Sequence, residues 1–200
     1  SGIIASWQYS ENNATGASNK VAIKNQLRAL KKVVDYKRLG IIFNPMEQNS
    51  IIQRNMVKRL ENRLNFTLNQ YRITCEADIE TVLPGINQNV DAVFIPADSM
   101  IKSLGHKIMS MINQYKIPSL SSVGSMVSED GVLLGLVPKY YELGRLAAQK
   151  AFLILHGTHP STIPSSVLDY YDISVNMNTA RKIGAQIPMS LLVMANEIVR

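Results

Sequence analysis

The chain has 200 residues, of which 46% are hydrophobic and 18% are charged, a composition typical of a globular domain with a sizeable core. No apolar run approaches the length of a membrane-spanning helix, and the single cysteine, Cys75, excludes an internal disulfide and a thiolate metal site. The net charge is +6, but the basic residues follow the solvent faces of predicted helices. No helix-turn-helix, zinc-binding or aromatic RNA-binding pattern accompanies them, which argues against nucleic acid as a partner.

The first part of the chain predicts a helix, a strand and a second helix. Residues 1–18 are polar and irregular, although Trp7 is large enough that we expect it to pack against other residues. Apolar residues at helical spacing predict a helix over residues 23–34. The uninterrupted apolar run of residues 39–43 predicts a strand buried on both faces, and helical spacing returns over residues 50–64.

The same order of strand, polar loop and helix then recurs along the chain. The predicted elements are an edge strand at 67–73, a short helix that begins at Asp78, buried strands at 91–96, 117–120 and 132–137, helices at 101–115 and 143–154, a linker at 161–164, a strand at 170–175 and two short helices within 176–200. Repeated strand–loop–helix units favour a parallel sheet with right-handed crossovers. The fold class predicted is therefore α/β, with a doubly wound parallel sheet and helices on both faces. This arrangement is a three-layer sandwich.

No catalytic or metal-binding pattern is found. The phosphate-binding glycine motifs and the Gly-x-Ser-x-Gly motif are absent. His106 falls on a predicted solvent face, His156 and His159 follow a helix end, and none has the spacing of a metal ligand. Cys75 is expected to be a structural residue at a strand end. The sequence thus predicts a protein that is not an enzyme, without a cofactor or a bound metal.

Polar loops follow three of the predicted strands, at residues 44–50, 97–99 and 121–125. The carboxyl ends of parallel strands meet at one edge of a sheet, where ligands bind in open α/β folds. Amides, hydroxyls, a carboxylate and helix N-termini at such an edge suit a small polar molecule. The structural alternative is that Asn49, Ser50 and Ser99 cap helices and that Asp98 forms a turn.

Several segments together resemble one family. They are Asn13-Ala-Thr-Gly16, Gly40-Ile-Ile-Phe-Asn-Pro-Met-Glu-Gln-Asn-Ser50, Asp91-Ala-Val-Phe-Ile-Pro-Ala-Asp98, Lys116-Ile-Pro118, Tyr140-Tyr-Glu-Leu-Gly144 and Val175-Asn176. In this order they resemble the substrate-binding proteins of ABC transporters, in the group with tryptophan- and tyrosine-binding members. The resemblance covers nearly the whole chain. It implies a periplasmic-binding-protein type I fold, in which two α/β lobes close on a ligand.

The resemblance implies a set of ligand-binding residues: Asn44, Glu47, Asn49, Ser50, Asp98, Ser99, Ser122 and Tyr140. Two departures remove negative charge from the expected cleft. Lys139 stands where the family usually has an acidic residue before the Tyr-Tyr pair. The loop over residues 121–124 reads Ser-Ser-Val-Gly, where an aspartate is common. These two departures therefore argue against a ligand whose ammonium group binds those carboxylates.

The resemblance also implies an organisation and partners. Residues 1–18 would be a remnant of the first lobe, residues 19–160 the second ligand-binding lobe, and residues 161–200 a crossover strand and helices that belong to or pack on the first lobe. The chain would then be a fragment that self-associates. We expect a small polar solute, such as one that resembles an amino acid, to be delivered to an ABC permease. The location expected is periplasmic or extracytoplasmic, with a lipid anchor on the full-length protein. The alternatives are a ligand-sensing regulatory core of the same fold and, as a residual, an α/β hydrolase or transferase.

Overall fold

The computed structural model describes residues 4–168 and 170–200, whose contacts divide the chain into two compact units. The smaller unit comprises Ser1–Val21 and Pro138–Tyr171, and the larger unit comprises Ala22–Val137 and Asp172–Arg200. These boundaries differ from those expected. Residues 138–160 pack with the N-terminal segment, and residues 172–200 pack with the main sheet. The assignment of each unit to a lobe of a longer protein stays a prediction.

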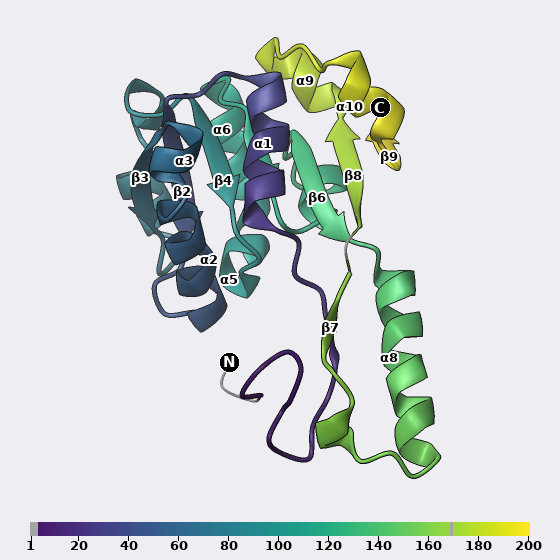
Figure 1. Ribbon diagram of the computed structural model, residues 1–200. Helices are drawn as coiled ribbons and strands as arrows, with labels where there is room; N and C mark the ends of the chain where they lie inside the picture. Colours follow the sequence, from purple (N-terminus) through teal and green to yellow (C-terminus); the bar gives the residue numbers. More distant parts are fainter. Residues whose placement is uncertain (1–3, 169) are drawn as a thin grey trace. The chain divides into compact units, whose positions relative to one another are not determined.

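The larger unit is built on a seven-stranded sheet with the strand order β3-β2-β4-β5-β6-β8-β9 (Figure 1). The strands are β2 (Arg38–Phe43), β3 (Thr67–Arg72), β4 (Ala92–Ile95), β5 (Ser119–Ser121), β6 (Leu134–Pro138), β8 (Tyr171–Asn176) and β9 (Glu197–Val199). The pairs β2–β3, β2–β4, β4–β5 and β5–β6 are parallel, as predicted, and the pair β8–β9 is parallel too. The arrow of β8 runs opposite to that of β6 in Figure 1. Strand β9 was not predicted.

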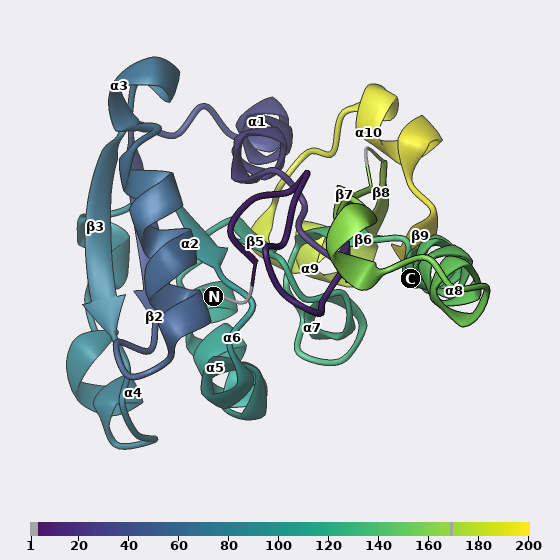
Figure 2. The ribbon, with the colours of Figure 1, turned by 60° about the horizontal axis from the view of Figure 1, so that its bottom comes forward.

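Helices cover both faces of this sheet, which confirms the three-layer arrangement. The helices are α1 (Ile23–Val33), α2 (Gln48–Lys58), α3 (Glu61–Leu64), α4 (Asp78–Val82), α5 (Ser99–Ser103), α6 (Gly105–Gln114), α7 (Ser125–Ser128), α9 (Met177–Ile183) and α10 (Met189–Met194), with a 3-10 turn, η1 (Ile86–Gln88). In Figure 1, α1, α2 and α3 lie in front of the sheet and α6 lies behind it, and Figure 2 shows the layers from below. Helix α9 packs against α6.

The core of the larger unit follows from the alternation of side chains along the central strands. Ile42, Val93 and Ile95 belong to one cluster that the helices of the α6 face complete. Phe43 and Phe94, at the intervening positions, are also buried. Successive side chains of a strand point to opposite faces of a sheet, so these apolar strands supply both layers at once. The prediction that these five side chains are buried is confirmed.

Two of the predicted helices are interrupted. The helix predicted over residues 101–115 is divided at Leu104 into α5 and α6. Gly105 opens α6 where the carboxylate of Asp130 approaches so closely that an added Cβ would lie 2.5 Å from it, and this contact explains why a glycine occurs there. The helix predicted over residues 50–64 is divided between α2 and α3. Helical periodicity continues across both breaks, and periodicity alone therefore could not reveal them.

The smaller unit contains one long helix, α8 (Tyr140–Leu155), a 3-10 turn, η2 (Pro160–Thr162), and two short parallel strands, β1 (Ala17–Ser18) and β7 (Ser166–Val167). The ammonium group of Lys150 is buried and donates to the carbonyl of Pro164 and to Oγ of Ser166. Burial lowers the pKa of this amine. Trp7 was expected to pack, but 47% of it is exposed. Cys75, in the larger unit, is likewise exposed rather than structural, since it follows β3 on a surface turn.

Candidate functional site

The three polar loops that the sequence singles out meet at one edge of the larger unit. Strands β2, β4 and β5 are neighbours in the sheet and run parallel, so their carboxyl ends lie at the same edge. Hydrogen bonds connect the loop after β2 directly to the loop after β4, and the loop after β5 is bonded to α1 and α2. The prediction that these loops come together is confirmed.

Asp98 holds the first two loops in place. One carboxylate oxygen accepts the backbone N–H of Asn44 at 3.3 Å, and the other accepts the N–H of Ile101 at 2.9 Å, which caps α5. The same N–H of Asn44 lies 3.2 Å from Oγ of Ser50, which is fully buried. Because Asp98 is only 3% exposed and both of its oxygens bind backbone groups, it has a structural role here. Its contact with a ligand, and that of Ser50, stay predictions.

Two more side chains of the first loop and helix reach the second loop from its solvent side. Nδ2 of Asn49 donates to the carbonyl of Ala97 at 2.7 Å, and the carboxylate of Glu47 accepts the N–H of Ser99 at 3.0 Å. Asn49 and Ser99 are exposed, and Glu47 is half-buried. These residues therefore present polar atoms at the loop surface, where a solute can meet them.

Helix α2 begins two residues earlier than predicted, at Gln48 and not at Ser50. The side-chain oxygen of Asn44 accepts the N–H of Met46 at 2.8 Å, and this tight turn lets the helix begin at Gln48. Asn49 and Ser50 were predicted to be N-caps but lie within the first turn of the helix. No side chain caps the first N–H groups of α2 among the described residues. The partial positive charge of the helix N-terminus is thus present at the loop edge.

Two glutamines connect the third loop to the rest of the edge, and the sequence analysis missed both. Oγ of Ser122 lies 3.0 Å from Oε1 of Gln26 and 3.2 Å from Oε1 of Gln53, and its single hydrogen can be donated to one of them at a time. The amide of Gln53 bonds both backbone groups of Ala97, at 3.3 and 3.4 Å. Gln26 is 1% exposed and donates to the carbonyl of Leu136 at 3.3 Å.

A signal for Gln26 was present in the sequence. It stands between Ile23 and Leu30 on the buried face of α1, where an amphipathic helix otherwise has apolar residues. A buried amide without a partner is costly, so a glutamine at such a position indicates a hydrogen-bonded network. Gln53 is half-buried and carries no comparable signal.

Tyr140 is the one candidate that belongs to the smaller unit, where it is the first residue of α8 and is 62% exposed. The other seven candidates belong to the larger unit. Within residues 4–168 and 170–200, no group of three or more His, Cys, Asp or Glu side chains could hold a metal ion. No helix in the same ranges is long and apolar enough to cross a membrane.

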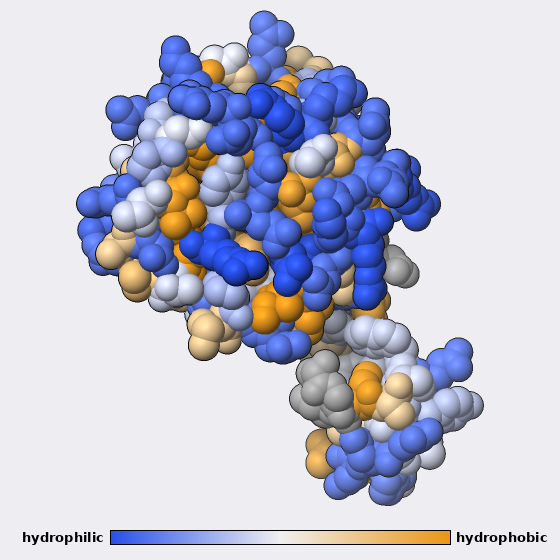
Figure 3. Space-filling view, turned by 90° about the vertical axis from the view of Figure 1, so that its left-hand side faces the viewer, coloured by the Kyte–Doolittle hydropathy of each residue, from blue (hydrophilic) through white to orange (hydrophobic). Residues whose placement is uncertain are grey.

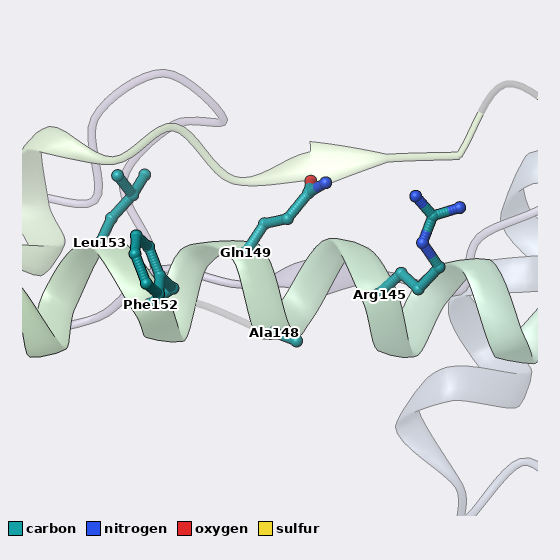
Figure 4. Close-up of a pocket in the computed structure, with 5 residues that line it drawn as sticks. All are labelled: Arg145, Ala148, Gln149, Phe152 and Leu153. Atoms are coloured by element: carbon teal, nitrogen blue, oxygen red, sulfur yellow. The ribbon is translucent and has the colours of Figure 1, made fainter.

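The smaller unit has a depression of its own along α8. It has a volume of about 470 Å³ and is lined by Arg145, Ala148, Gln149, Phe152 and Leu153. Figure 4 shows these side chains along one side of the helix. The lining is mainly apolar, and Phe152 is 59% exposed. This surface has the character of an uncovered helix face rather than that of a polar solute site.

Comparisons with known proteins place this geometry in a family. The family model for ABC transporter substrate-binding proteins matches residues 1–199. A tyrosine-binding protein from Clostridioides difficile is 26% identical over 186 residues, which are 92% of this chain and 54% of that protein. The chain therefore spans about half the length of this curated relative.

Solved structures show the same fold. A conserved domain protein from Vibrio cholerae matches with a TM-score of 0.85 at 23% identity, over 98% of this chain and 66% of that one. The ABC domain in complex with L-Trp from Streptococcus pneumonia matches with a TM-score of 0.85 at 23% identity, over 98% and 67%.

The chain belongs to the ABC transporter substrate-binding protein family. Proteins of this family bind solutes and are not catalytic, and in general they work outside the cytoplasm. The chain has the fold of the periplasmic-binding-protein type I structures.

Proposed function

We propose that the chain is the ligand-binding part of an ABC transporter substrate-binding protein and that it captures an amino-acid-like solute at the edge formed by the loops after β2, β4 and β5. The observation that carries this proposal is the set of hydrogen bonds that fixes these loops together at the carboxyl ends of three parallel strands. Preorganised loops lower the entropic cost of binding. The family match and the tyrosine-binding relative support the class of solute.

The groups at the edge suit the two charged ends of an amino acid. The first turn of α2 offers backbone N–H groups and a partial positive charge, which favour a carboxylate. The carboxylate of Glu47, half-buried beside Ser99, favours an ammonium group. Asn44 and Asn49 add amide donors and acceptors. Ser122 completes the proposed ligand set of the larger unit, and a role for Tyr140 in ligand binding stays a prediction.

The wider role follows from the family. We propose that the bound solute is delivered to an ABC permease and that the protein acts outside the cytoplasm. The match of one family model along residues 1–199 supports this role over a sensor or regulatory core of the same fold. An anchoring lipid, expected for the full-length protein, stays a prediction.

A nuclear magnetic resonance titration of the 200-residue chain tests the proposal, because it detects weak as well as tight binding. L-Tyrosine and L-tryptophan are the probes, and glucose is the control. We expect saturable amide shifts at residues 44–50, 97–99 and 121–124 with an amino acid and none with glucose. Shifts confined to α8, or no saturable shift with either amino acid, would contradict the proposed site.

A further inference from the structure

The net charge of the protein is concentrated in one helix layer. Helices α1, α2 and α3, with the residues between α2 and α3, contain eight basic residues and one acidic residue, a net charge of +7. The basic residues are Lys24, Arg28, Lys31, Lys32, Arg54, Lys58, Arg59 and Arg63, and the acidic residue is Glu61. The net charge of the whole chain is +6, so the remainder is slightly acidic. We call this surface the basic layer.

The opposite face of the sheet lacks this concentration of unpaired cations. Residues 76–130, which include α4, α5, α6 and α7, contain seven acidic residues and three basic residues, a net charge of −4. Two of those three cations are held in ion pairs, Lys102 with Glu129 and Asp130, and Lys107 with Glu76. Helix α9, which packs on α6, adds Arg181 and Lys182 to this side, and even so it has no excess of cations comparable to that of the basic layer.

Most of the basic layer is unpaired and open to solvent. Lys31 pairs with Asp35 and Lys58 with Glu61, but Lys24, Arg28, Lys32, Arg59 and Arg63 make no ion pair with the described residues. Of these five, all but the half-buried Lys24 are exposed. Arg28 and, more weakly, Arg63 lower the pKa of Lys24 through their positive charges, which shows that cations of α1 and α3 act on one another. In Figure 3, hydrophilic residues cover most of the larger unit on the side that α3 and β3 occupy.

We propose that the basic layer is an interaction surface that binds the anionic phospholipid headgroups of a membrane and holds the protein close to it. A surface of like charges with few counterions of its own destabilises itself, and an anionic partner relieves that repulsion. Each basic residue near an anionic bilayer contributes favourably, and the contributions add over a layer of this size. This inference goes beyond solute binding and does not depend on which solute is captured.

A membrane suits the basic layer better than a nucleic acid does. The aromatic residues of the segment, Tyr36 and Phe43, are both buried and so offer no face on which a base can stack. Exposed cations on neighbouring helices match headgroups at a surface and do not require insertion into the bilayer. The family, moreover, works outside the cytoplasm in general.

Vesicle sedimentation with paired variants tests the proposal. We expect the wild-type chain to sediment with vesicles of phosphatidylglycerol and phosphatidylcholine at low ionic strength and not with phosphatidylcholine alone. About 0.5 M salt should release it, because screening by the salt then limits electrostatic attraction to a range of a few ångströms. Arg28→Glu with Arg63→Glu should lower the partition coefficient by about tenfold. The milder pair Arg28→Gln with Arg63→Gln should give an intermediate loss.

The matched control changes the net charge by the same amount elsewhere. Arg181→Glu with Lys182→Glu alters two exposed cations of α9, which packs on α6, and should leave vesicle binding within about twofold of wild type. Circular dichroism melts show whether each variant is folded. An equal loss in both pairs would assign the binding to net charge alone and overturn the proposal. So would a wild type that ignores anionic vesicles, or a short DNA duplex that displaces it from vesicles at equal phosphate concentration.

Discussion

The two units of the chain bury their apolar side chains very differently. In the larger unit, the sheet supplies a continuous core in which Ile42, Val93 and Ile95 pack against helices. In the smaller unit, the apolar residues of α8 remain at the surface, with Phe152 59% and Leu155 84% exposed. The difference teaches that a multistranded sheet with helices on both faces makes its own core. One helix and two strands of two residues each do not.

The largest expected effect tests the core of the larger unit. Phe94 is fully buried in β4, so Phe94→Ala removes its contacts and leaves a cavity, at a cost of about 3 to 5 kcal/mol in the free energy of unfolding. Phe152→Ala is the matched control, because that ring is largely exposed, and it should change the free energy by less than about 0.5 kcal/mol. Denaturant melts measure both values. Equal losses of stability in the two variants would contradict the claim that the two units bury their apolar side chains differently.

A smaller effect is expected where the loop edge joins the core. Asp98→Ala removes the acceptor of the Ile101 and Asn44 N–H groups, and it should destabilise the larger unit by about 2 kcal/mol. Hydrogen exchange should become faster at residues 97–101. The structure thus favours the structural alternative for Asp98 that the sequence left open. An unchanged melt would show that these hydrogen bonds contribute little.

The exposed face of α8 should promote self-association. Leu155 is the most exposed of its apolar residues, and Leu155→Glu places a charge in any contact that this face makes. The dissociation constant of the associated form should rise by about tenfold, which corresponds to about 1.4 kcal/mol. Sedimentation velocity over a range of concentrations measures it. A wild-type chain that stays monomeric throughout would refute this expectation, and a variant that associates as wild type does would place the contact elsewhere.

The central fold was predictable because its strands are short, apolar and followed by proline or polar loops. Residues 39–43 and 92–96 contain no polar side chain, and such runs indicate buried parallel strands. The later part was harder to predict. Glu197–Val199 forms a strand that is mostly exposed, and a run of three residues has no periodicity from which to recognise it. The unit boundaries depend on long-range contacts, which local patterns do not report.

The site was predictable in its place but not in its detail. Repeated strand–loop–helix units predict parallel strands, so the sequence alone locates the three loops at one edge of the sheet. Which side chain faces a solute and which one braces the loop depends on hydrogen bonds between residues about 50 positions apart, such as Asn44 with Asp98. Gln53 hydrogen-bonds to the backbone of Ala97, and a backbone partner cannot be recognised from the type of its side chain.

The most direct test of the proposed solute site compares two exposed asparagines by titration with L-tyrosine and L-tryptophan. Asn49 lies at the loop edge, and Asn62 lies on α3, outside the three loops. Asn49→Ala should raise the dissociation constant by about fivefold, or about 1 kcal/mol, while the free energy of unfolding falls by no more than about 1 kcal/mol, the loss expected for its hydrogen bond to Ala97. Asn62→Ala should leave both quantities unchanged. If Asn49→Ala binds both amino acids as wild type does, this edge of the sheet is structural and the proposed site is wrong.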